Sequence, residues 1–343
     1  MDTTALKYPG AVLALALCSA CASGLAQPQG NMAATASSVS PSVRYVGKTL
    51  SVNGRLATAA RAPSGSLPRY QTMLPTEHAK PDDFEYIINE YGTYAGVFDY
   101  PKSDAQIGKI DNVGGQGCTN VLYGYGKGII WIVAGEKQIT EYQLLKKPIK
   151  TLSDSIGKPS SCAMNTSGDL AVGILYGSEG GDVVIYKDAD RPGTIYTTPL
   201  VEEYFDGYDD RGNLFADGFT SSGFFGLVEL PAGTSKFRPI ATSNSVLFPG
   251  SVQWDGKFLT VFDQQANAFY QYTVNGSTAT LQGTVTLDGS SDCAQTWIVP
   301  HLAYCADAGT NDGEVFHYPA GGSPVATFTG TFDLPLGTVA ARK

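Results

Sequence analysis

A short motif recurs along most of the chain at a nearly constant spacing. Each copy is an alternating apolar segment that ends just before proline, glycine or a polar residue, as in VFDYP, VVIYK and VFHYPAGG. The last apolar residues of the six copies are Tyr100, Tyr142, Tyr186, Leu230, Tyr272 and Tyr318. Successive anchors are 42, 44, 44, 42 and 46 residues apart. Periods of this length are typical of β-propeller blades, so the spacing predicts one small sheet per repeat.

The length of the repeated region supports the same number of units. Residues 83 to 343 number 261, which gives six repeats of about 43.5 residues each. The third repeat divides into four strand segments, SSCAMNTSG, DLAVGILYG, DVVIYKDAD and GTIYTTPLV, separated by Gly, Asp and Ser turns. The 40 Gly, 19 Pro and 19 Tyr of the 343 residues also favour short strands over helices. We therefore expect an all-β fold, a six-bladed β-propeller with four-stranded blades.

The two ends of the repeated region complement each other. The first repeat begins at FEYIINEYG and lacks the innermost strand that the others carry, whereas the chain ends with an unpartnered segment, LPLGTVAARK. We expect this C-terminal strand to join the N-terminal blade and close the ring, because closure removes an exposed sheet edge. A right-handed solenoid, the alternative repeat architecture, would not need this complementary pair.

Several segments resemble the turn and second strand of NHL-type repeats, namely DDRGNLFADG, TSGDLAVG and WDGKFLTVFD. Residues 83 to 343 as a whole are similar to six-bladed NHL-like or TolB-like propellers. Through SVQWDGKFLTV, PAGGSPVATFTG and GYDDRGNLF, the chain also looks like a group of uncharacterised exported bacterial propellers. The resemblance implies the fold, but it implies no activity, because propellers of this kind include enzymes, scaffolds and binding modules.

The N-terminal region has the features of an export signal followed by a tether. Residues 1 to 26 contain the apolar run AVLALALC and small residues before a cleavage site, which predicts a secreted protein. The alternative is a lipoprotein signal that ends before Cys21, with Cys21 as the lipidated residue. Residues 27 to 82 are rich in Ala, Ser and Pro and are expected to be a disordered tether. We expect a periplasmic, cell-surface or extracellular location and no transmembrane helix, with membrane contact only through a possible lipid anchor.

Four cysteines follow the tether, at positions Cys118, Cys162, Cys293 and Cys305. In an exported protein they predict two disulfides, for which the sequence allows three pairings. An alignment of the repeats on their inner strands places Cys118, Cys162, Asp206, Gly250 and Cys293 in one layer near the mouth of the channel. That layer favours Cys118 with Cys162 across adjacent blades and Cys293 with Cys305 within one blade. Metal ligation by the thiolates is the alternative, although this part of the sequence contains no CxxC pair.

The same alignment brings polar side chains toward the central channel or its entrance. The candidate ligand-binding residues are Asn120, Asn165, Asp206, Asp209, Gln253 and Gln295. Asp206 and Asp209 are the candidate metal ligands, because Ca²⁺ prefers oxygen ligands. The simpler alternative is that an Asp in a DDRGN turn caps its own backbone and that the channel amides bind water. No other cofactor is indicated. The aromatic residues are expected to serve packing first, with Trp131, Trp254 and Trp297 as candidates to face a ligand.

These patterns exclude some functions and leave two classes of function open. Nucleic-acid binding is excluded by the formal net charge of −9, since phosphate recognition needs clustered Lys and Arg. The sequence contains no GxSxG, HExxH or phosphate-binding loop, and it does not decide whether the chain is an enzyme, although it favours a non-enzyme. We expect a monomer that binds a small molecule, glycan or protein at its channel mouth. A metal-dependent, lactonase-like hydrolase or lyase that uses channel carboxylates is the alternative, by analogy of fold only.

Overall fold

The computed structural model describes residues 83–342, except 91–93, 135–137, 145–147, 154–156 and 178–179. The predicted signal peptide, Cys21 and the tether 27–82 lie outside the described residues. In the described part every regular element is a β-strand, apart from a short 3-10 turn at Lys187–Ala189. No helix in that part is long and apolar enough to cross a membrane. The prediction of an all-β chain is therefore confirmed.

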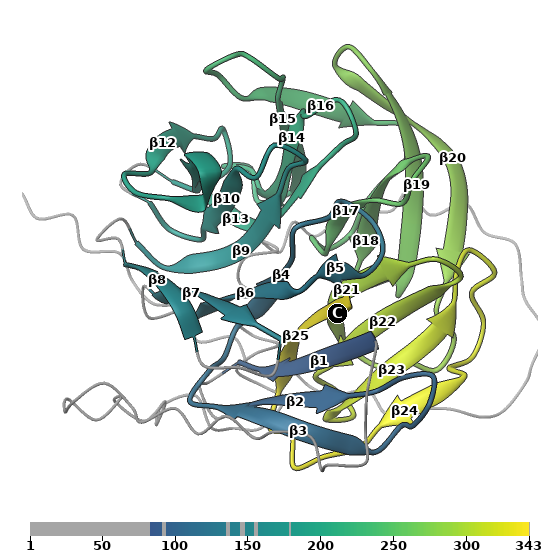
Figure 1. Ribbon diagram of the computed structural model, residues 1–343. Helices are drawn as coiled ribbons and strands as arrows, with labels where there is room; N and C mark the ends of the chain where they lie inside the picture. Colours follow the sequence, from purple (N-terminus) through teal and green to yellow (C-terminus); the bar gives the residue numbers. More distant parts are fainter. Residues whose placement is uncertain are drawn as a thin grey trace, which may run out of the picture. The chain divides into compact units, whose positions relative to one another are not determined.

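The strands form five sheets (Figure 1). The first combines both ends of the described chain in the order β3 (Gln106–Asp111), β2 (Tyr94–Phe98), β1 (Asp83–Asn89), β25 (Pro335–Arg342) and β5 (Gly126–Lys127). The second has the order β4 (Gln116–Cys118), β6 (Ile129–Ala134), β7 (Gln138–Gln143) and β8 (Pro148–Ser153). The third runs from β9 (Pro159–Met164) through β10 (Leu170–Ile174) and β11 (Asp182–Tyr186) to β12 (Thr194–Thr197), as the four segments of the third repeat predict.

The remaining strands form a large sheet and a small one. The eight-stranded sheet begins with β13 (Glu202–Tyr208), β14 (Leu214–Phe219), β15 (Phe225–Leu230) and β16 (Arg238–Thr242). It continues with β20 (Thr278–Thr286), β19 (Ala268–Asn275), β18 (Leu259–Asp263) and β17 (Val252–Trp254). The last sheet contains β21 (Cys293–Val299), β22 (Leu302–Asp307), β23 (Asp312–His317) and β24 (Ala326–Phe328). Within the large sheet, β13–β16 and β17–β20 are antiparallel runs, and they meet only through a short parallel pairing of β16 with β20.

Burial changes along each sheet in the way that a layered packing requires. Strand β13 is buried at every position, because its two faces pack against other sheets. The outer strand β20 alternates between buried and exposed side chains, since only one of its faces is covered. The repeated aromatic anchors lie in the core: Tyr142, Tyr186 and Tyr272 are almost completely buried. Their regular spacing therefore reflects packing, as the sequence predicts for most of them.

Strand β25 is the inner neighbour of β1, and the two pair antiparallel from Asp83↔Arg342 to Asn89↔Pro335. The expected joining of the C-terminal strand to the first sheet is confirmed. The inner strands also contact one another in series: β25 lies against β4, β4 against β9, β9 against β13, and β13 against β17. Hydrogen bonds link β17 to β21, and β21 contacts β25. This series gives the propeller-like arrangement in Figure 1.

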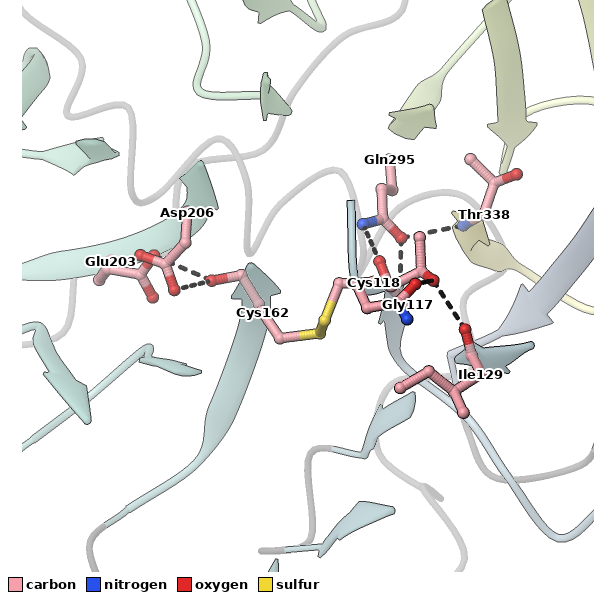
Figure 2. Close-up of a disulfide and its surroundings, with 11 residues drawn as sticks. Gly117, Cys118, Ile129, Cys162, Glu203, Asp206, Gln295 and Thr338 are labelled. Atoms are coloured by element: carbon pink, nitrogen blue, oxygen red, sulfur yellow. Dashed lines mark hydrogen bonds between the residues drawn. A yellow bond between two sulfur atoms is a disulfide. The ribbon is translucent and has the colours of Figure 1, made fainter. Parts of the chain in front are cut away.

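Two disulfides hold the inner strands, and both preferred pairings are present. Cys118 on β4 is bonded to Cys162 on β9, with the Cα atoms 5.7 Å apart, so this bond joins two neighbouring sheets (Figure 2). Cys293 and Cys305, with Cα atoms 5.5 Å apart, join β21 to β22 within one sheet.

The predicted layer of equivalent residues is only partly correct. Cys162 and Asp206 each lie three residues before the turn residue of their strand, Asn165 and Asp209. Cys293, however, is the first residue of β21 and pairs with Asp307, at the opposite end of the strand. Gly250 precedes β17 altogether. The alignment fails because the connections that lead to β17 and β21 are longer than those that lead to β9 and β13, a difference that a constant repeat spacing does not reveal.

We predict that the two disulfides contribute unequally to stability. Cys118–Cys162 closes a separation of 44 residues and Cys293–Cys305 one of 12. In the chain-entropy description, the longer loop restricts the unfolded chain more, by about 1 kcal/mol. Cys118→Ser with Cys162→Ser should therefore lower the free energy of unfolding by more than Cys293→Ser with Cys305→Ser does, as measured by urea denaturation. Equal losses would contradict the entropic account.

Candidate functional site

Strand β13 carries Asp206, a predicted site residue, together with an irregularity that brings a second carboxylate beside it. The register of β13 with β14 shifts between Glu203 and Phe205, so the register skips Tyr204, which forms a β-bulge. In a regular strand, side chains three residues apart point to opposite faces. The extra residue reverses this relation, and Glu203 and Asp206 point to the same side (Figure 2).

Two serines of β9 donate hydrogen bonds to these carboxyl groups. Ser160 Oγ donates a hydrogen bond to Glu203 Oε2 at 2.6 Å. Ser161 Oγ lies 2.9 Å from Asp206 Oδ2 and 3.1 Å from Glu203 Oε1, so it bridges the two acids. Gly173 on β10 provides the space, since a Cβ at this position would lie only 1.9 Å from Glu203 Oε2. The absence of a side chain at Gly173 leaves space for the two acids in the interior, and the two serine hydroxyls hydrogen-bond them.

Burial dominates the electrostatics of this carboxyl pair. It raises the pKa of Asp206 to about 7, while the hydrogen bonds from Ser161 and Glu203 oppose the shift. Burial and then the charge of Asp206 raise the pKa of Glu203 well above its usual range. A third acid, Asp217 on β14, is fully buried, and its pKa is also raised by burial. Near neutral pH the pair therefore keeps at least one proton.

Two oxygens of this carboxyl cluster, which comprises Glu203, Asp206 and Asp217, have no partner. Gly250 N donates to Asp217 Oδ2 at 3.2 Å. Oδ1 of Asp206 and Oδ1 of Asp217 accept no hydrogen bond from any described residue. Buried carboxylate oxygens need a proton, a water molecule or a cation, and these are the oxygens that could hold a hard cation such as Ca²⁺. Because the three side chains are at most 6% exposed, a substrate cannot reach them in this conformation.

Three of the predicted ligand residues instead stabilise their own turns. Asn165 Oδ1 accepts two backbone N–H groups of the β9–β10 turn. Asp209 Oδ1 does the same in the β13–β14 turn, and its Oδ2 accepts from the side chain of Arg211 at 3.1 and 3.2 Å. Asn120 exchanges hydrogen bonds with the backbone of Lys127. The contacts of Asn165 and Asp209 are the Asx-turn alternative that the sequence allows, whereas Asn120 closes a longer loop.

The two predicted glutamines connect inner strands of different sheets. Gln295 Oε1 accepts from Gly117 N on β4 and from Thr338 N on β25, both at 2.9 Å, and its Nε2 donates to Gly117 O (Figure 2). Gln253 Oε1 accepts from Ile298 N at 2.8 Å, and its Nε2 donates to Ile298 O. The six predicted residues therefore do not form one site. Asp206 alone joins the carboxyl cluster. The two glutamines form hydrogen bonds between inner strands of different sheets.

One end of the inner strands is crossed by a segment that we call the covering segment, residues 120–128 between β4 and β6. Leu122 O accepts from Gln253 Nε2 at 3.3 Å. Gly124 N donates to Ile298 O, and Gly124 O accepts from Trp297 Nε1 at 2.9 Å. The indole of Trp297 is thus used inside the protein, and Trp131 is fully buried. Among the three predicted tryptophans, only Trp254 is partly exposed.

A second group of potential metal ligands surrounds the disulfide of the last sheet. Ligand atoms of Cys293, Cys305, Asp307 and Glu314 lie within 4.8 Å of one another. The two cysteines are bonded to each other, and Asp307 Oδ1 accepts backbone N–H groups from Asp292, Gly309 and Thr310. Cys293, Cys305 and Asp307 are therefore engaged in holding the sheet, whereas Glu314 Oε2 accepts no hydrogen bond from a described residue, and burial raises the pKa of Glu314 to about 7.

Sequence reasoning did not find Glu203, Asp217 or Ser161. The spacing of Glu203 and Asp206 argues against a pair in a regular strand, so only knowledge of the bulge would have joined them. Asp217 and Ser161 lie on other strands, and their contacts depend on how sheets face one another. The covering segment does leave a trace in the sequence, because NVLYGYGKG is longer than the turns DDRGN and WDGKF at the equivalent place.

Comparison with known proteins identifies the fold alone. No protein-family model and no curated protein sequence matches this chain. Among solved structures, a chain of a nidogen–laminin complex aligns with a TM-score of 0.59 and 12% identity, over 76% of this chain and 98% of that one. A protein of unknown function from Desulfotomaculum acetoxidans DSM 771 aligns with a TM-score of 0.51 and 8% identity, over 76% and 99%. These likenesses support a β-propeller.

The carboxyl pair predicts a specific pH dependence of stability. An unfolded Asp has a pKa near 3.9, below the folded value, so between about pH 4 and 7 the folded state binds more protons than the unfolded state. Stability should therefore fall as pH rises through 7. Glu203→Gln with Asp206→Asn should reduce this slope by about 1.4 kcal/mol per pH unit for each proton removed. Urea denaturation between pH 5 and 8 measures the slope, and an unchanged slope would contradict the prediction.

Proposed function

We propose that this chain is an exported six-bladed β-propeller that acts as a binding module for another protein. The strand pairing supports the count of six. The eight-stranded sheet consists of two four-stranded antiparallel runs joined only at Ala241↔Thr278 and Thr242↔Ala279. Counted separately, these runs and the other four sheets give six units, which equals the number of sequence repeats. The NHL-like character of the repeats remains a resemblance of sequence.

Export agrees with the cysteine chemistry. Disulfides persist in oxidising compartments, and both cysteine pairs of the described domain are bonded. The leader 1–26 would direct secretion, and the alternative lipid anchor on Cys21 would attach the domain to a membrane through residues 27–82. In either form the propeller would meet partners outside the cytoplasm.

The observation that carries the proposal is a group of exposed apolar side chains on neighbouring loops. We call Tyr176, Val201, Phe224 and Leu247 the apolar face. Phe224 is 61% exposed, Leu247 51%, Tyr176 47% and Val201 38%. Large exposed apolar groups cost free energy in water, and where they cluster they mark surfaces that bind partners.

The hydrogen bonds of these loops bring the four residues together. Val201 N donates to Phe219 O at 2.8 Å, and the residue after Phe219 donates to Phe224 O. The ring of Phe248, which follows Leu247, lies 5.4 Å from the ring of Phe219. Leu175 O, next to Tyr176, accepts from Glu203 N at the start of β13. The loops that carry the apolar face are therefore neighbours, and the buried ring pair of Phe219 and Phe248 lies between two of them.

The loops of the apolar face carry no charge in their described part. The described positions of the connections are 175–177, 180–181, 198–201, 220–224 and 243–251, and none is Lys, Arg, Asp or Glu. Ser and Thr surround the apolar side chains, as at the rim of many protein interfaces. Glu202, the first residue of β13, adjoins Val201, and after burial its carboxylate is the main cause that raises the pKa of Tyr176. The apolar face therefore has an acidic group at its edge and fits a protein partner with an apolar patch.

The apolar face lies on the side of the propeller where the channel mouth is not crossed by the covering segment. Neighbouring strands in each four-stranded unit are antiparallel, as β13, β14 and β15 are. The connection that leads into the first strand of a unit therefore lies on the same side as the turn between its second and third strands. The covering segment follows a first strand and belongs to the opposite side. A partner on the apolar face would therefore meet the open mouth. One similar structure is a chain of a nidogen–laminin complex, so a similar fold occurs in a complex between proteins.

Site-specific photo-crosslinking in the producing cell tests the proposal. A photoreactive phenylalanine analogue in place of Phe224 should give one discrete adduct with another protein, and Leu247→Ser should reduce its yield severalfold. The matched control position is Ile195, which is 50% exposed but lies on the outer strand β12. Equal adducts from positions 224 and 195, or none from 224, would refute a partner at the apolar face.

A metal-dependent hydrolase is the second candidate, favoured by the two unpartnered oxygens of Asp206 and Asp217. A cation bound there would take the place of protons, and an adjacent water could then be polarised for attack on a lactone or ester. This function also requires the buried cluster to open, because its side chains are hardly exposed.

Thermal unfolding distinguishes this candidate. After EDTA treatment, Ca²⁺ at 100 times its Kd should stabilise the protein by about 2.7 kcal/mol at pH 8. The effect should be smaller at pH 5, where protons occupy the carboxyl pair, and should vanish with Asp206→Asn. Mg²⁺ and Zn²⁺ serve as comparison ions. No shift with any of the three ions would remove the metal-dependent candidate and leave the binding module standing.

A further inference from the structure

A pocket of about 180 Å³ opens between the two halves of the large sheet, away from the carboxyl cluster. It lies between the β13–β14 turn, the β17–β18 turn and strand β19. Its principal lining residues are Asp209, Arg211, Phe215, Trp254, Lys257 and Tyr272. A cavity of about 150 Å³ suffices for benzene, so this pocket can take one six-membered ring with a substituent.

The inner part of the pocket is apolar and aromatic. Phe215 is fully buried, and Leu259 and Tyr272 are 1% exposed. Trp254, at the end of β17, lines the pocket and is partly exposed. Indole faces stack favourably on flat rings and on the apolar faces of sugars.

The rim of the pocket is cationic. Arg211 and Lys257 reach it from turns of two different strand pairs. The Asp209 carboxylate is already used, because it accepts hydrogen bonds from its own turn and from Nε and Nη2 of Arg211. Lys257 Nζ lies 4.6 Å from the centre of the Phe258 ring and makes no ion pair with a described residue. Because Arg211 is paired with Asp209, which also lines the pocket, the uncompensated positive charge at the rim comes from Lys257.

We propose that this pocket binds a small ring compound that carries a carboxylate, either an aromatic acid or a sugar acid. The ring would stack on Trp254, and the carboxylate would lie at the rim between Lys257 and Arg211. Arg211 keeps Nη1 available, because its bonds to Asp209 use Nε and Nη2. The pocket lies on the side of the β13–β14 turn, opposite the apolar face, so the proposal does not depend on the protein-binding function.

Binding is measured by isothermal titration of the full chain with benzoate and with glucuronate, each against its neutral analogue, benzyl alcohol or glucose. Saturable binding of at least one acid, about tenfold tighter than its neutral analogue, is expected from charge-assisted hydrogen bonds. Lys257→Glu should weaken this binding about tenfold, whereas Lys187→Glu, the same change at an exposed site outside the pocket, should leave it unchanged. Preference for benzoate or glucuronate tells the two kinds of ligand apart.

Tryptophan fluorescence gives a second, ligand-independent measurement. Trp131 and Trp297 are 0% and 7% exposed, so collisional quenchers act mainly on Trp254. The rim cations should make iodide a stronger quencher than caesium, and Lys257→Glu should reverse the order. Absence of saturable binding by both acids would overturn the proposal. Equal affinities of the Lys257→Glu and Lys187→Glu proteins, with both folded by circular dichroism, would overturn it as well.

Discussion

The pairing of β25 with β1 is the interaction on which the other contacts depend. Through this pairing β25 becomes the inner strand of the first sheet. The series of inner-strand contacts therefore continues from β21 through β25 to β4. Gln295 strengthens this junction, because a single amide binds the backbones of both β25 and β4. Without β25, the edge of β1 would be open and Gln295 would lose one of its partners. The disulfide between Cys118 and Cys162 then holds the next contact in the series.

Features that arise within one repeat could be predicted from the sequence, and features that arise between sheets could not. The four strands of the third repeat follow from alternating apolar residues and glycine turns, and the closing strand follows from a missing and a surplus segment. The Cys118–Cys162 bond also follows from the repeat spacing. In contrast, the bulge at Tyr204, which makes neighbours of Glu203 and Asp206, leaves no sign in the spacing. Gln253 and Gln295 were predicted to face a ligand, but their partners belong to strands distant in sequence.

The described domain separates three kinds of polarity. The carboxyl pair of Glu203 and Asp206 is buried beside serine hydroxyls, four exposed apolar side chains lie on neighbouring loops, and a lysine and an arginine line a small pocket. The separation follows from the antiparallel strands, because each sheet sends alternate connections to opposite sides. Loops on one side can therefore change without altering those on the other. A propeller of this kind offers two independent surfaces on one frame.

The origin of β25 also determines when the first sheet can form. Pro335 follows Asn89 by 246 residues, so β1 emerges from the ribosome long before the strand that must pair with its inner edge. During that interval the inner edge of β1 has no β25 to pair with, and the ring of inner strands cannot close. Closure is therefore a late step of folding, because it needs two segments that lie far apart in the sequence to meet.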